Sequence, residues 1–156
     1  MADTSTRDRI SVVLTLAHRD AILEEVEFAF EAAGDLLFML ERGAESERDR
    51  NDARDVVARL DVALGILDQL GWEPEGEREA YVLEVDEGVE RFAARIERFA
   101  LTGLEYNRPR LFAADDRVRE TTERLIDTDL EKLRAARKIR TAFKLARGLK
   151  VSVTPA

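Results

Sequence analysis

Apolar residues in the middle of the chain recur at alternating steps of three and four residues, a spacing typical of helices that pack in coiled-coil-like bundles. This stripe comprises Val82, Val85, Val89, Phe92, Ile96 and Phe99. It predicts a helix over about 74–102, ended by Gly103. The β-branched residues at its start leave a short strand over 81–86 as the alternative.

Three further segments have helical periodicity, at about 5–42, 46–70 and 114–147. A glycine follows the last periodic residue of each segment, and glycine readily adopts the left-handed conformation that ends a helix. These glycines are Gly43, Gly71 and Gly148. Asp115 or Asp116 is suited to begin the last helix, and residues 149–156 resemble a tail.

The helices occupy nearly the whole chain, so we expect an all-α fold with a single domain over 1–156. Short connections favour antiparallel neighbours, and an up-down-up-down four-helix bundle of long helices is the simplest arrangement. Charge supports it: 132–150 contain eight basic residues and no acidic residue, whereas 73–90 contain eight acidic residues and one basic residue. Antiparallel packing of the last two helices brings these opposite charges together.

Composition limits the possible chemistry. The 156 residues include no cysteine and a single histidine, His18, and no glycine-rich phosphate loop or nucleophile–base pattern is recognisable. The polar start has no signal-peptide pattern, and no stretch resembles a membrane span. The sequence therefore favours a soluble, cytoplasmic, non-enzymatic protein that needs no cofactor and does not bind a membrane.

Polar residues on apolar faces give the first candidate site. Ser11, His18 and Glu25 are spaced by seven residues, and Asp129 interrupts the apolar stripe of the last helix. A carboxylate in such a stripe needs a partner or a shifted pKa. We expect Glu25 and Asp129 to join a polar network with His18 or an arginine, and His18, Glu25 and Asp129 are the candidate metal ligands. An internal salt bridge without a metal, or a simple position at the edge of the apolar stripe, is the alternative, and the sequence favours it.

The basic end of the last helix gives a second candidate, an anion-binding or nucleic-acid-binding surface. Its residues are Arg137, Lys138, Arg140, Lys144 and Arg147. The net charge of −8 argues against nucleic acid, as does the lack of interleaved aromatic residues. Neutralisation by the acidic segment 73–90 explains the same charges without a ligand.

The first helix has more apolar surface than one bundle core can cover. Apolar residues point in nearly every direction at 12–16 and again at Phe28, Phe30, Phe38 and Met39. We expect a homodimer through this helix, or docking of another helical protein, and a monomer in which this helix is central is the alternative. The sequence thus predicts a protein–protein interaction or dimerisation module, with metal or small-ligand binding and anion binding as the other hypotheses.

Overall fold

The computed structural model describes residues 10–43, 47–73, 80–112 and 115–148. Within these ranges the chain forms strand β1 (Ile10–Leu14), helix α1 (Leu16–Glu41), helix α2 (Glu47–Leu70), strand β2 (Tyr81–Val85), helix α3 (Glu87–Asn107), the short 3-10 helix η1 (Arg108–Phe112) and helix α4 (Asp116–Ala146). The all-α class is confirmed, with a two-stranded sheet added to the helices.

The predicted helix over 5–42 is wrong at its start, because residues 10–14 form a strand. Val12 and Leu14 are buried while Ser11 and Val13 are exposed, an alternation that suits a strand with one covered face. Helix α1 begins only after Thr15, whose hydroxyl accepts a hydrogen bond from the His18 backbone N–H at 3.2 Å. Of the apolar residues expected to protrude at 12–16, Val12 and Leu14 are therefore covered within the fold, whereas Val13 and Leu16 stay exposed.

The strand alternative over 81–86 is confirmed, and the helix predicted over 74–102 is corrected. Strand β2 pairs antiparallel with β1, with Ile10 opposite Val85 and Leu14 opposite Tyr81. Asp86 caps α3 by accepting a hydrogen bond from the Val89 N–H at 2.8 Å. Helix α3 then continues through Gly103, the predicted stop, to Asn107. Residues 74–79 of that prediction lie outside the described residues.

The other two helices lie where the sequence predicted them. Helix α2 ends at Leu70 and α4 begins after Asp115, which accepts a hydrogen bond from the Arg117 N–H at 2.9 Å. Gly43, Gly71 and Gly148 have φ values of 82°, 68° and 66°, so each takes the left-handed conformation that follows a helix. The predicted tail at 149–156 lies outside the described residues.

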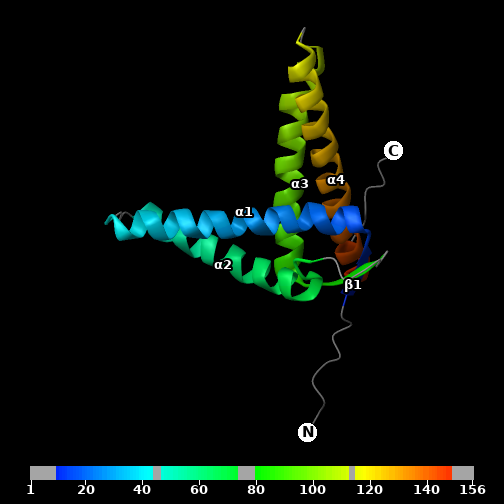
Figure 1. Ribbon diagram of the computed structural model, residues 1–156. Coiled ribbons are helices and arrows are strands. Elements are labelled where there is room, and N and C mark those ends of the chain that lie inside the picture. Colours follow the sequence, from blue (N-terminus) through cyan, green and yellow to red (C-terminus); the bar gives the residue numbers. More distant parts are fainter. Residues whose placement is uncertain (1–9, 44–46, 74–79, 113–114, 149–156) are drawn as a thin grey trace.

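The helices form two antiparallel pairs that cross, rather than the single up-down-up-down bundle expected from short connections (Figure 1). The α1–α2 pair lies across the lower half of the α3–α4 pair, and the small sheet lies beside the crossing. Each pair extends beyond the crossing at one end. The two strands explain this arrangement, because they tie the start of α1 to the start of α3.

The hydrophobic core lies where the two pairs cross. Its members from α1 and α2 include Ile22, Val26, Ala63 and Ile66, and α3, α4 and the strands contribute Leu14, Leu83, Phe92, Ile96, Ala136 and Ile139. A smaller cluster of Ala100, Leu104 and Leu133 continues the packing between α3 and α4. Helix α1 has no buried residue after Ala29, so the core ends halfway along this helix.

Candidate functional site

Glu25 takes part in a polar cluster, as predicted, but its partner is Lys132 rather than histidine or arginine. The Lys132 ammonium lies 2.9 Å from Glu25 Oε1 and 3.4 Å from Glu24 Oε1, so it joins α4 to α1. Burial of Lys132 opposes its charge, but the hydrogen bonds and charges of both glutamates prevail and raise its pKa. This cluster is an internal salt bridge, the alternative favoured from the sequence.

Asp129 lies beside the same cluster, against the backbone of α3. A Cβ atom added to Gly103 would lie 3.0 Å from Asp129 Cγ and closer still to Oδ2, so Gly103 makes room for this carboxylate. Burial raises the pKa of Asp129, and Glu24 and Glu25 add to this effect while Lys132 opposes it. The structure thus brings Asp129 within electrostatic reach of Glu25.

His18 lies apart from this pair, at the packed joint between α1 and α4. Its Nε2 is 3.8 Å from Glu131 Oε2, and its buried Nδ1 has no hydrogen-bond partner among the described residues. Burial and nearby Lys138 lower the pKa of His18, while Glu131 acts in the opposite direction. Ser11, the first of the three residues in the predicted line, lies on β1 rather than on α1.

The described residues contain no group of three or more His, Cys, Asp or Glu side chains placed to hold a metal ion. A site formed by His18, Glu25 and Asp129 therefore stays a prediction, and their observed contacts to Glu131, Lys132 and Gly103 do not support it.

The basic end of α4 faces acids of α3, as its charge pattern predicted. Arg140 contacts Glu90 at 3.0 Å and Glu97 at 2.9 Å. Arg137 lies 3.7 Å from Glu97, and Arg147 lies 3.5 Å from Glu87. Three of the five candidate anion-binding residues are thus paired with acids, whereas Lys138 is exposed and Lys144 is half-buried. These contacts explain much of the basic charge without a ligand.

Arg19 joins the start of α1 to the end of α2, and the sequence analysis did not single it out. Its side chain is buried, and the residue is only 1% exposed. It donates hydrogen bonds to the carbonyls of Leu70, at 3.3 Å, of Trp72, at 2.9 Å, and of Gly71, which together end α2. Its guanidinium also lies 5.0 Å from the centre of the Tyr81 ring. The sequence signal was an arginine two residues before the apolar run Ala21–Leu23.

Beyond the crossing, the α1–α2 pair forms an arm without a core. We define this arm as residues 30–41 of α1 and 49–62 of α2, none of which is buried, although Phe30 and Val62 at its base pack against the core. Leu37 is 62% exposed and Val57 is 60% exposed, and Phe38, Met39 and Leu40 are exposed as well. Exposed apolar residues gathered on one element often mark an interaction surface.

Comparisons of this chain with protein families, with curated proteins and with solved structures found no match. Among the described helices, none combines the length and apolar surface needed to cross a membrane.

Proposed function

We propose that this protein is a non-enzymatic interaction module that forms a homodimer through its α1–α2 arm. The observation that carries the proposal is the absence of any buried side chain along the arm, although both of its helices are rich in apolar residues. An isolated pair of helices buries too little surface to offset the entropy lost on folding. A second arm packed against it would complete a four-helix bundle.

The outward face of α2 has the pattern that such a bundle uses. Ala53, Val57, Leu60 and Leu64 follow steps of four, three and four residues. They line one shallow groove on the surface of α2, on the side away from the buried Ala63 and Ile66. This spacing is the seam of a coiled coil, in which apolar side chains of one helix fit between those of another.

Charges beside the seam favour an antiparallel pairing of two copies. Arg54 and Asp61 both line the groove and are seven residues apart on one side of it. In a twofold-symmetric, antiparallel pair of α2 helices, Arg54 of each copy would lie near Asp61 of the other. Such flanking charges contribute little energy but select orientation. A second copy is therefore the occupant that the arm fits best.

Light scattering coupled to gel filtration tests this proposal. The monomer has a mass of 17.7 kDa, so we expect a species of twice that mass, and we expect Val57→Glu to return it to the monomer. Val82→Glu is the matched control, because Val82 is 57% exposed, close to the 60% of Val57, but lies on β2 away from the arm. A native chain that stays monomeric at high concentration, or equal effects of both substitutions, would contradict the proposal.

A further inference from the structure

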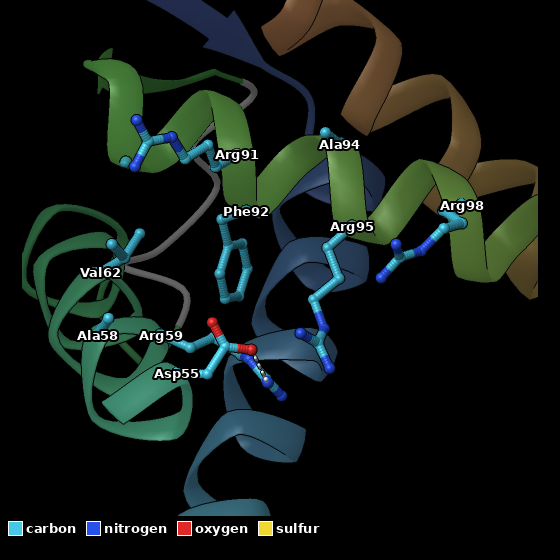
Figure 2. A pocket seen from close by; sticks show the side chains of 10 residues that line it. Asp55, Ala58, Arg59, Val62, Arg91, Phe92, Ala94, Arg95 and Arg98 are labelled. Atoms are coloured by element: carbon cyan, nitrogen blue, oxygen red, sulfur yellow. Dashed lines mark ion pairs between the residues drawn. The ribbon is translucent and has the colours of Figure 1, made fainter. Parts of the chain in front are cut away.

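A cleft between α2 and α3 concentrates positive charge in a chain whose net charge is −8. Its volume is about 400 Å³, and four arginines line it: Arg59 from α2, and Arg91, Arg95 and Arg98 from α3. Among the described residues that line it, Asp55 is the one acidic residue. Figure 2 shows Phe92 standing between the two helices, with Arg95 extending from α3 towards the Arg59–Asp55 pair.

Among the described residues, Arg95 and Arg98 form no ion pair, although the charges of Asp55 and Glu25 act on Arg95 from a distance. Arg59 is paired with Asp55 at 3.7 Å, and the 80% exposed Arg91 is paired with Glu87 at 3.9 Å. Within the described part of the chain, the guanidinium groups of Arg95 and Arg98 have no hydrogen bond or ion pair and contact only the face of Phe99, at 5.1 Å and 5.5 Å from the ring centre. Burial lowers the pKa of the half-buried Arg95, and the nearby charge of Arg59 lowers it further.

A second cavity of about 360 Å³ adjoins the first, since both are lined by Arg59, Phe92 and Arg95. Its other walls are mainly apolar and include Phe28 of α1 and Phe99 of α3. Glu25 also lines it but is already paired with Lys132. The joined cleft thus has a cationic part and an aromatic part, which is the usual composition of a small-molecule site.

We propose that this cleft binds a small organic anion in which a carboxylate or phosphate group is attached to a flat apolar body. The planar guanidinium groups of Arg95 and Arg98, with Arg59 opposite, match the oxygens of such an anion. The rings of Phe28, Phe92 and Phe99 offer stacking and edge contacts to the body. This inference does not depend on dimerisation, because its lining residues all belong to one chain.

The site is tested by NMR titration of the ¹⁵N-labelled full chain with four probes. 2-Naphthoate and 2-naphthyl phosphate carry both features, 2-naphthylmethanol carries only the body, and inorganic phosphate carries only the charge. We expect the two naphthyl anions to shift the NMR signals of amides in α2 and α3 around the cleft. We expect 2-naphthylmethanol and inorganic phosphate to bind at least about tenfold more weakly. The tighter of the two anions identifies the head group.

The variants assign any binding to the arginines. Arg95→Gln should weaken the tighter anion about tenfold, and Arg98→Gln should weaken it as well without affecting folding, because Arg98 is exposed. Arg124→Gln is the matched control, since it removes the same charge from α4, where Arg124 pairs with Glu120 at 2.8 Å. Equal binding of 2-naphthylmethanol, or no change with either cleft variant, would overturn the proposal. Shifts caused by duplex DNA but by neither naphthyl anion would overturn it too.

Discussion

The two helix pairs have the same antiparallel form but differ in how far each is packed along its length. Between α3 and α4, small buried residues allow close approach: Ala93, Ala100, Ala135 and Ala136. Ion pairs from Arg140 to Glu90 and Glu97 add contacts across this pair. The arm of the α1–α2 pair has large apolar side chains, yet none of them is buried. Apolar content alone therefore does not make a helix pair stable, and small residues at the contact matter as much.

The comparison also separates two uses of apolar surface. Helices α3 and α4 have buried residues along most of their length, and these residues pack in the core at the crossing and in the smaller cluster between the two helices. In the arm, Leu37 and Phe38 are exposed, and the groove between the helices is lined by apolar residues such as Leu36 and Val56 together with Asp35, Asp49 and Asp52. This arrangement suits a surface that is completed by a partner. The difference between the two helix pairs can be tested by substitutions.

The largest effect is expected at Arg19, which joins α1 to the end of α2. Arg19→Met keeps the length of the side chain but leaves the carbonyls of Leu70, Gly71 and Trp72 without their donor. We expect the free energy of unfolding to fall by about 3–5 kcal/mol, measured by urea denaturation. Asp20→Asn is the control, since Asp20 is the exposed partner of Arg19, and a change of about 0.5 kcal/mol or less is expected. Equal losses of unfolding free energy in Arg19→Met and Asp20→Asn would show that the hydrogen bonds to the buried carbonyls are not the cause of the effect.

One glycine-to-alanine substitution in each helix pair should distinguish the two pairs, with a change in stability of intermediate size. Gly103→Ala should destabilise the protein by about 1–3 kcal/mol, because the new Cβ would press on Asp129 between α3 and α4. Gly34→Ala, in the arm, has no neighbouring atom within 4 Å and should stabilise α1 by about 0.5–1 kcal/mol. Thermal unfolding measures both.

The cause of the Gly103→Ala effect can be checked with a second substitution. Asp129→Ala removes the carboxylate that the new methyl group would meet, so the double variant should recover much of the stability lost in Gly103→Ala. If the two losses simply add, the close approach of α3 and α4 at this point is not the source of the effect.

The smallest effect concerns His18, which lies between the two pairs. Its pKa in the folded protein is lower than the ordinary value of 6.5, so the unfolded chain binds more protons below about pH 6.5. The stability that His18 contributes is fully present above about pH 6.5. It is lost as the pH falls towards the pKa that His18 has in the folded protein. Urea midpoints at pH 7.5 and pH 5 should therefore differ less in His18→Gln than in the native chain. The same difference between the two pH values in both proteins would contradict the assignment of this pH dependence to His18.

The sequence predicted what depends on local pattern. Helices over 46–70 and 114–147 follow from periodicity, and the glycine stops at Gly43, Gly71 and Gly148 follow from backbone chemistry. The strand at 10–14 was missed because its partner lies at 81–85, and an isolated run of apolar residues fits a helix equally well. Opposite charges on α3 and α4 were informative because they are concentrated in two continuous segments.

The candidate sites were predicted less completely, because they depend on contacts between helices. Glu25 and Asp129 were expected in one network, but Lys132 was assigned to the basic segment 132–150, which was expected to face the acidic segment 73–90. The spacing of Arg91, Arg95 and Arg98 was visible along one helix face. Only the crossing of the pairs brings that face against Arg59 and Phe28. The contact of α1 with the end of α2 explains why Arg19, which interrupts an apolar segment, is structural.

The pairing of β1 with β2 also has a consequence for the order of folding. Each helix pair is formed by neighbouring segments of the chain, whereas the sheet joins Leu14 to Tyr81 from opposite halves. Contacts between distant segments form slowly, because a long loop must first be closed. We therefore expect helix formation to precede the crossing in time, and the docking of β1 on β2 to limit the folding rate.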